Sequence, residues 1–242
     1  MSGNFHSFFN EKNNTPSIMN LKGRGKVERI STNIKVYDLE ESLVASGYAM
    51  LTDYNEEEIK KEIELLKENV STDSKHYKRA ERLLRAALDS GHPNFLTGIR
   101  VSMDVTFTNK VWVEWQRYNF QDIVTSFSTM HRISKFHLDE AFIKYTDSEI
   151  IERLKVLQKE YLENHTPENY LKLLYSTPSG LKLTARVSTN YMQLAHMYKQ
   201  RRNHRLPEWN KFTQELLELP LFYEFLKMNN SLDHKDLREW LK

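Results

Sequence analysis

Residues 99–107 alternate strictly between apolar and polar side chains, with the apolar residues at every odd position. This period of two is typical of a β-strand that has one face in a core and the other in polar surroundings. Residues 181–187 alternate in the same way, and residues 34–37 do so over a shorter stretch. A sheet built from these strands has to bury its apolar face, so the other segments are expected to cover it.

Most other segments have the periodicity of amphipathic helices, with apolar residues every three or four positions. Pro167 and Pro207 occupy positions where proline favours the first turn of a helix. Helices are predicted over residues 55–69, 75–89, 109–127, 147–163, 190–202 and 207–217, and Gly91 is expected to end the second of them. Together with the strands, they predict an α+β fold in which long helices flank a twisted sheet.

Residues 1–30 are predicted to be a flexible tail, because Asn, Ser, Lys and Gly dominate there. The alternative is that Phe5, Phe8 and Phe9 anchor this segment on a partner subunit. No repeat or low-complexity linker follows, so residues 31–242 are predicted to form a single domain.

Composition excludes several classes of protein. The chain has 35 basic and 33 acidic residues, a net charge of +2, which is small for a protein that coats nucleic acid. It has no cysteine, which excludes disulfides, thiolate catalysis and cysteine-based metal sites. There is no apolar run of membrane-spanning length and no apolar core of a signal peptide. The expected setting is therefore soluble and cytoplasmic, without a membrane partner.

Three segments carry residues suited to ligand chemistry. The first consists of two stretches, Gly91–Phe95, which contains His92, and Trp115–Asn119, which contains Arg117. A histidine directly after a helix more often has a loop or capping role than a ligand-binding one. A guanidinium suits phosphate, but Arg117 is as consistent with an ion pair.

The second segment, Thr125–Arg132, gathers four hydroxyls, an imidazole and a guanidinium. It is suited to a phosphate or a pyrimidine ring, or is a polar turn. The third, Asn190–Arg202, places polar residues along one side of a helix. The alternative is a basic helix face that is simply exposed to solvent. Histidine spacing does not indicate a metal site, and only seven glycines leave no room for a Rossmann or P-loop motif.

In this order, the three segments resemble the flavin-dependent thymidylate synthase family over roughly residues 34–225. Gly91-His92 matches the family's first element, and Arg117 matches the first arginine of its Gln-x-x-Arg-His-Arg signature. Ser126 or Ser128 lies near the signature serine. Asn190 and Arg201 reproduce the later spacing of an asparagine and an arginine eleven positions on.

The signature itself is incomplete. Tyr118 and Asn119 replace its histidine and second arginine, and Glu114 stands where the family has glutamine. Met192 stands where an arginine that contacts flavin is usual. Contacts to phosphate are therefore expected to be missing, and each lost contact of this kind costs about 1.5–3 kcal/mol unless it is replaced.

The resemblance implies a reaction and its cofactors. A homotetramer would bind FAD between subunits, with NADPH as reductant and methylenetetrahydrofolate as carbon donor, and would methylate a deoxyuridine monophosphate at C5. It implies two catalytic residues, Arg201 and Ser128. The nucleotide would be bound by Arg117, Ser126, Ser128 and Arg201, and the flavin by His92, Asn94, Tyr118, Asn119, Asn190 and His196.

Two other functions remain open from the sequence. The incomplete signature favours a flavin-free relative that binds a nucleotide or a partner without turnover. The basic stretch Lys199–Arg205, followed by Trp209, is also consistent with a nucleic-acid-associated module. The small net charge argues against nucleic acid as the main partner.

Overall fold

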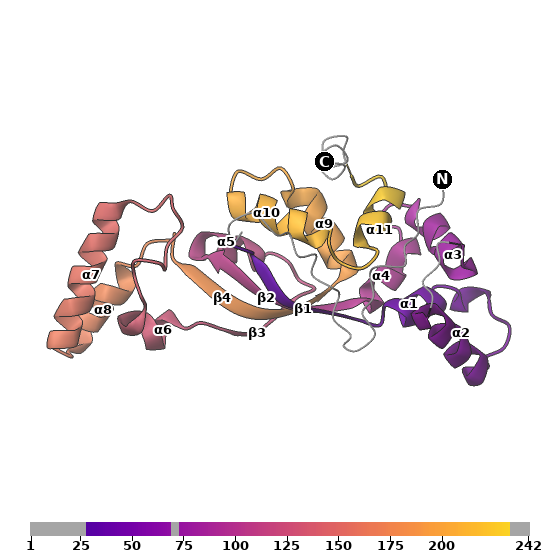
Figure 1. The fold of residues 1–242 in the computed structure, drawn as a ribbon, viewed down its shortest axis with the longest axis horizontal. Helices are drawn as coiled ribbons and strands as arrows, with labels where there is room; N and C mark the ends of the chain where they lie inside the picture. Colours follow the sequence, from indigo (N-terminus) through magenta and orange to yellow (C-terminus); the bar gives the residue numbers. More distant parts are fainter. Residues whose placement is uncertain (1–27, 69–72, 233–242) are drawn as a thin grey trace.

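The computed structural model describes residues 28–68 and 73–232. Four antiparallel strands form one sheet in the order β1-β2-β4-β3 (Figure 1). The strands are β1 at Ser31–Tyr37, β2 at Arg100–Thr108, β4 at Lys182–Asn190 and β3 at Asp122–Ser126. The two central strands, β2 and β4, pair without interruption from Arg100↔Asn190 to Thr108↔Lys182. The short strand β3 is one edge of the sheet.

One face of the sheet is buried and the other is polar. The odd-numbered residues of β2 are fully buried: Val101, Met103, Val105 and Phe107. The residues between them are partly exposed, and Arg100 at the start of the strand is exposed. This confirms the alternation seen in the sequence. Helices cover the apolar face (Figure 1): α5 at Asn109–Trp115, α9 at Tyr191–Arg201, α10 at Pro207–Leu216 and α11 at Phe222–Met228.

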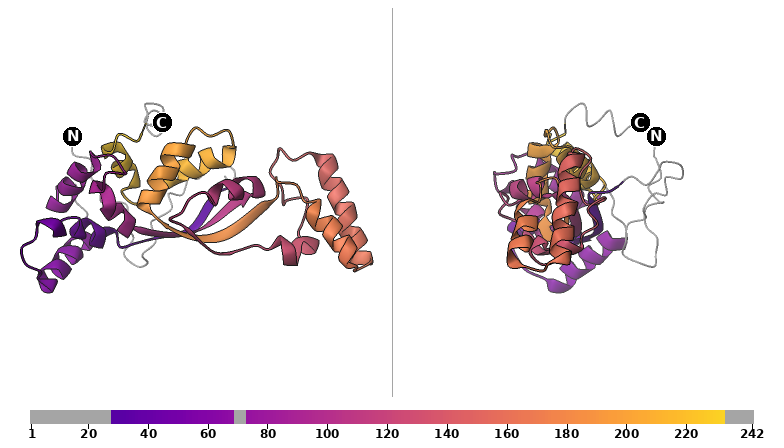
Figure 2. Two further views of the ribbon diagram at one scale, coloured as in Figure 1. Left: turned by 180° about the vertical axis from the view of Figure 1, so that it is seen from behind. Right: turned by 90° about the vertical axis from the view of Figure 1, so that its left-hand side faces the viewer.

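Two groups of helices lie at opposite ends of the sheet (Figure 2). At one end are α1 (Leu39–Ala45), η1 (Tyr48–Met50), α2 (Glu56–Glu68), α3 (Lys75–Leu84), η2 (His92–Asn94) and α4 (Phe95–Gly98). At the other are α6 (Thr129–Arg132), η3 (Ile133–Lys135), α7 (Ser148–Glu163) and α8 (Pro167–Tyr175). The α7–α8 end has its own apolar cluster, and Leu183 of β4 packs against both this cluster and the main one. The predicted mixture of helices and one sheet is confirmed.

The predicted helix over residues 109–127 is wrong in its second half. Helix α5 ends at Trp115, and residues 122–126 form strand β3 instead. The β-branched run Ile123-Val124-Thr125 favours extended backbone, and β4 offers it a partner strand. Ile123 is therefore 39% exposed instead of pointing inward from a helix.

Helix α3 also ends earlier than predicted, at Leu84. The amide of Asn229 donates hydrogen bonds to the carbonyls of Leu84 and Ala86, at 2.7 and 2.8 Å, and so satisfies the carbonyls at this end. Gly91, with φ at +80°, precedes η2 and does not end the helix. This is a backbone conformation that glycine adopts without steric cost.

Residues 28–30, which the sequence places in the tail, are bound to the main body. The Glu215 carboxylate accepts hydrogen bonds from the backbone N–H groups of Ile30 and Ser31, at 2.9 and 2.7 Å. Arg29 pairs with Glu218 at 2.7 Å. Residues 1–27, including the three phenylalanines considered as an anchor, lie outside the described residues. Within the described ranges, none of the helices has the length and apolar character needed to cross a bilayer.

Candidate functional site

The end of α5, the end of α9 and the start of α10 meet around a cluster of aromatic rings. Trp115 stacks on Trp209 with centroids 6.0 Å apart and planes 9° apart, and Phe107 of β2 packs against both. These rings are fully buried, so they fix the backbone at this meeting point. The indole N–H of Trp209 donates a 3.0 Å hydrogen bond to Glu114 Oε2.

Arg201 lies at the centre of this arrangement. Its Nη1 donates to Glu114 Oε2 at 2.8 Å, and its Nε donates to the Tyr118 hydroxyl at 2.8 Å. The guanidinium carbon is 5.0 Å from the Trp209 ring centroid and 5.6 Å from that of Tyr118, within the range of cation–π attraction. The side chains of Arg201 and Glu114 are only 13% and 15% exposed. Nη2 is the one guanidinium nitrogen that makes no hydrogen bond within the described residues.

Tyr118 joins the α5 end to α9. Its hydroxyl accepts from Arg201 and donates to Gln200 Oε1 at 3.0 Å. Burial raises the pKa of Tyr118, although Arg201 opposes the effect, so the hydroxyl is protonated at neutral pH. The backbone N–H of Phe120 donates to Gln193 Oε1 at 3.3 Å. The segment between α5 and β3 is therefore held along one side of α9.

Asn190 has a structural role in the chain as it stands. Its side-chain oxygen accepts a 2.9 Å hydrogen bond from the Gln193 N–H and caps α9. Tyr118, Asn190 and most of the donors of Arg201 are thus already engaged inside the protein.

Other predicted site residues have polar groups that are available to a ligand. Arg117 and Asn119 are exposed, and neither side chain makes a hydrogen bond or ion pair within the described residues. The same holds for Arg205, which lies just after α9 and was not among the predicted residues. Arg117 lies three residues after Glu114 and its charge acts on Tyr118, and Arg205 lies four residues after Arg201. Unpaired guanidinium groups suit an anion.

His92, Asn94 and His196 lie farther along the other side of α9. His92 and Asn94 are exposed in η2, which is followed by α4, and α4 packs against α9. His196 is half-buried in α9. Burial, with a further contribution from Lys199, lowers the pKa of His196, so its ring is neutral at pH 7.

Ser126 and Ser128 do not join the other predicted nucleotide-binding residues within one chain. Strand β3 begins at Asp122, opposite Ser188 of β4, and runs away from α9 toward α6. Ser126 ends the strand, and Ser128 immediately precedes α6. Ser126 is four residue steps along the strand from Asp122, a distance of about 13 Å.

Sequence reasoning missed two of the residues that contact Arg201. Glu114 was noted only as a departure from the signature, and Trp209 only as a neighbour of a basic stretch. The sequence shows only that Glu114 stands among aromatic residues of one predicted helix and that Arg201 belongs to another. Nothing in the sequence places the two helix ends side by side.

Two hollows lie elsewhere in the molecule. One of about 440 Å³ is lined mainly by α1 and α2, and one of about 200 Å³ lies between these elements and α3. Neither includes a residue of the arrangement around Arg201. In the part of the chain that the structure describes, no three His, Asp or Glu side chains gather as metal ligands.

Comparison with solved structures identifies the fold. A flavin-dependent thymidylate synthase, ThyX, from Helicobacter pylori in complex with FAD and dUMP superposes with a TM-score of 0.60 at 13% identity, over 84% of this chain and 100% of that one. A second ThyX structure from Helicobacter pylori, also with FAD and dUMP, gives 0.59 at 15% identity, over 85% and 98%. The UMP/dUMP methylase PolB from Streptomyces cacaoi, bound with 5-Br UMP, gives 0.55 at 11% identity, over 86% and 99%.

These neighbours are similar to the chain in fold. No protein-family model matches the sequence. No curated protein sequence matches it either.

Proposed function

We propose that this chain is an enzyme that transfers a one-carbon unit to C5 of a deoxyuridine monophosphate. Two observations support the proposal. The fold is that of ThyX and of a UMP/dUMP methylase. Two exposed and unpaired arginines follow the members of the Arg201–Glu114 pair in the chain, Arg117 three residues after Glu114 and Arg205 four residues after Arg201. This second observation carries the proposal, because such a site attracts the phosphate of a nucleotide.

We assign a role to each arginine from the N–H groups that have no partner within the protein. Arg117 binds the phosphate, because its charge is exposed and unpaired. Arg201 presents Nη2 to the pyrimidine, because Nε and Nη1 are engaged by Tyr118, Glu114 and His204. A guanidinium that contacts two rings and is held by a carboxylate is preorganised, so it loses little side-chain entropy when a ligand binds.

The residues near α9 also suit a flavin nucleotide. His92, Asn94, Asn119 and His196 all have side-chain polar groups without a hydrogen bond in the described residues. We therefore assign these four residues to flavin binding. Asn190 and Tyr118 contribute indirectly, because Asn190 caps α9 and Tyr118 holds Arg201 and Gln200 in place. Bound FAD would supply the hydride that converts the methylene carbon of methylenetetrahydrofolate to a methyl group, with NADPH as the source of electrons.

A second copy of the chain completes this site in the proposal. Ser126 and Ser128, which we assign to the nucleotide phosphate with Ser128 near the reacting ring, lie at the wrong end of β3 to serve their own chain. The edge strand and its flanks expose large apolar side chains, which is typical of a contact surface: Phe120, Ile123, Val124, Phe127 and Met130. A homotetramer would place these serines at a neighbour's Arg117.

The test is the absorbance spectrum of the purified protein with added FAD, followed by turnover of dUMP with NADPH and methylenetetrahydrofolate. We expect a flavin band that comigrates with the protein, and formation of thymidylate. Turnover should fall at least tenfold in Arg201→Ala. A protein that binds neither FAD nor dUMP would overturn the proposal.

One observation favours a second function, a nucleotide-binding protein without turnover. Glu114 neutralises Arg201, so the charge available to stabilise a reacting ring is reduced. In that case dUMP binds in calorimetry and Arg117→Ala weakens it, but no flavin band and no product appear.

A further inference from the structure

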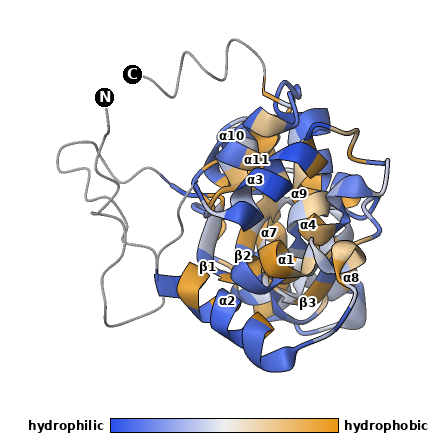
Figure 3. Ribbon diagram, turned by 90° about the vertical axis from the view of Figure 1, so that its right-hand side faces the viewer, coloured by the Kyte–Doolittle hydropathy of each residue, from blue (hydrophilic) through white to orange (hydrophobic). Residues whose placement is uncertain are grey.

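The α1–α2 end of the molecule is strongly acidic. Residues 38–68 contain ten acidic and three basic side chains, a net charge of −7, although the whole chain carries +2. Figure 3 shows α2 coloured mainly as hydrophilic, beside a largely hydrophobic α1. Charge segregated in this way creates a field that attracts a basic partner.

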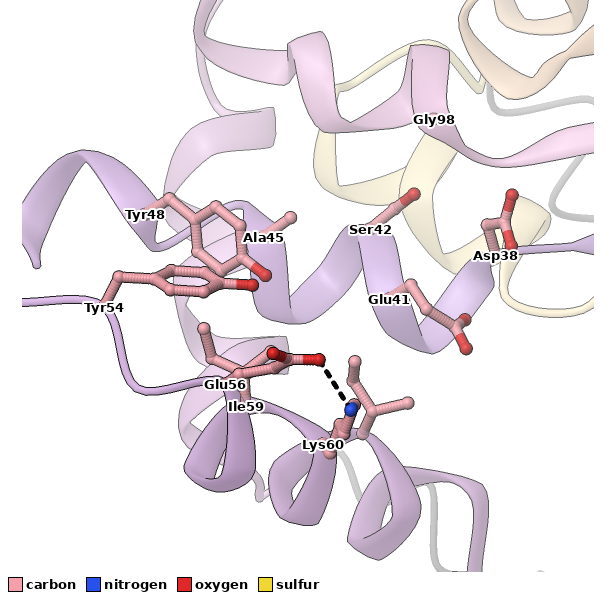
Figure 4. A pocket seen from close by; sticks show the side chains of 11 residues that line it. Asp38, Glu41, Ser42, Ala45, Tyr48, Tyr54, Glu56, Ile59, Lys60 and Gly98 are labelled. Carbon is pink, nitrogen blue, oxygen red and sulfur yellow. Dashed lines mark ion pairs between the residues drawn. The ribbon is translucent and has the colours of Figure 1, made fainter.

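A groove of about 440 Å³ opens between these elements (Figure 4). The rings of Tyr48 and Tyr54 form one end of it, with centroids 6.3 Å apart and planes at 89°. Ala45, Ile59 and Ile63 give it apolar walls. The site therefore offers apolar and aromatic surface to a ligand.

Carboxylates surround this apolar surface. Glu56 pairs with Lys60 at 2.6 Å and Glu41 pairs with Lys67 at 3.0 Å, and both pairs are exposed to solvent. Asp38 has no ionic partner among the described residues. Exposed ion pairs of this kind contribute little, so a cation from a ligand can replace the lysines at small cost.

The chain between the two tyrosines that line the groove, residues 49–53, borders it, and we call residues 49–54 its rim. Leu51 also lines the neighbouring hollow. Met50 is 83% exposed, Tyr54 64% and Leu51 50%. A ligand that combines cationic groups with large apolar side chains fits this surface, because it gains cation–π contacts with the tyrosines and buries apolar area on the rim.

The sequence of residues 1–27 has this chemistry. It contains four basic residues, Lys12, Lys22, Arg24 and Lys26, against the single acidic Glu11, and three phenylalanines at positions 5, 8 and 9. Its net charge of +3 is opposite to that of the groove.

The point of attachment makes the groove reachable. Glu215 holds the backbone at Ile30 and Ser31, and from there β1 leads directly to Asp38 at the groove. The seven residues of β1 span about 23 Å, whereas 27 residues can extend to roughly 90 Å.

We propose that residues 1–27 bind in the α1–α2 groove, with their cations at the Asp38, Glu41 and Glu56 carboxylates and their phenyl rings on the Tyr48–Met50 side. The segment is that of the same chain, because its attachment at Ile30 and Ser31 leaves the groove within its reach.

Photo-crosslinking of the full-length protein tests this. Benzoylphenylalanine replaces Met50 on the groove rim, and a matched variant carries it at Leu162 on α7, which is 50% exposed at the opposite end. After irradiation, mass spectrometry identifies the crosslinked peptides. We expect crosslinks from position 50 to residues 1–27, and no such crosslinks from position 162. A band of monomer mass is expected for the same chain, and a band of dimer mass, which indicates a second copy, would contradict the proposal.

A second pair of variants tests the electrostatic part. Adding Glu41→Lys and Glu56→Lys to the Met50 probe should lower the yield of crosslinks to residues 1–27 at least threefold. Two reversals on the other group of helices, Glu152→Lys and Glu163→Lys, should leave it unchanged. The proposal is overturned if position 50 crosslinks elsewhere or not at all, if position 162 gives the same products, or if both pairs of reversals act equally.

Discussion

Two arginines bind the ends of helices together in this protein, and they do so in different ways. Arg79 of α3 donates from Nε to Ser46 Oγ at 3.0 Å, and from Nη2 to the carbonyls of Leu43 and Val44 at 3.1 Å each. Arg201 of α9 donates only to side chains, and keeps Nη2 without a partner in the described residues. Both contact a histidine, and each has a glutamate in its network.

The two bonding patterns indicate a structural role for Arg79 and a ligand-binding role for Arg201. Arg79 donates to carbonyls at the end of α1, and a Cβ added at Gly47 would come within 2.3 Å of its guanidinium, so this group packs closely against the backbone. Arg201 contacts the rings of Tyr118 and Trp209, and the unpaired Arg117 directly precedes Tyr118 in the chain. An arginine bonded to main-chain carbonyls holds helices, whereas one held by side chains, with unpaired cations near them in the chain, is positioned for an anion.

The largest effect is expected from Arg79→Met. The variant loses three hydrogen bonds, to Ser46 Oγ and to the carbonyls of Leu43 and Val44, so the free energy of unfolding should fall by about 2–4 kcal/mol. Urea denaturation measures it, with Arg82→Met, an exposed position on the same helix, as the control expected within about 0.5 kcal/mol of wild type. A loss at Arg79 as small as that of the control would contradict the structural role.

The reverse pattern is expected at Arg117. Arg117→Ala should weaken dUMP binding by about 10- to 100-fold, as expected for a lost charge-assisted phosphate contact. Stability should not change, because the side chain has no partner to lose. Calorimetry with dUMP and with deoxyuridine separates the roles, since the nucleoside has no phosphate. An equal loss for both ligands would remove Arg117 from the phosphate site.

A smaller effect is expected at Glu114. Glu114→Gln removes the charge that neutralises Arg201, so dUMP should bind about 3- to 10-fold more tightly, while the free energy of unfolding falls by about 1 kcal/mol. Calorimetry and urea denaturation measure the two effects. Weaker binding in this variant would show that Glu114 itself contacts the ligand.

The smallest effect is a pH dependence at His76. This ring contacts Glu62 of α2, and Arg79 lies 2.8 Å from its Nδ1. Burial lowers the pKa of His76, opposed by the Glu62 hydrogen bond and reinforced by Arg79 and Lys75. Between that lowered pKa and the ordinary value near 6.5, the unfolded chain binds more protons, so stability decreases as the pH falls.

The variant His76→Gln should lessen this loss. Urea midpoints at pH 7.5 and 5.5 measure it in both proteins, and His196, whose pKa is also lowered, is present in both and cancels. An identical pH slope in the two proteins would contradict the assignment to His76.

The sequence predicted the sheet best where burial enforces a period. Val101, Met103, Val105 and Phe107 point into the core as their alternation indicated. It failed at β3, because an edge strand with every residue exposed has no periodic pattern and is defined by its pairing with β4. For the same reason, the pairing of Glu114 with Arg201 was beyond sequence reasoning: it depends on where two helix ends meet.

Hydrogen–deuterium exchange with and without dUMP tests the account most directly, because it reads both regions in one experiment. We predict slower exchange on dUMP binding in residues 115–121 and 196–205, around Arg117 and Arg201, and no change in residues 39–63 of the α1–α2 end. Protection at the α1–α2 end without protection around Arg201 would contradict the assignment of the nucleotide site.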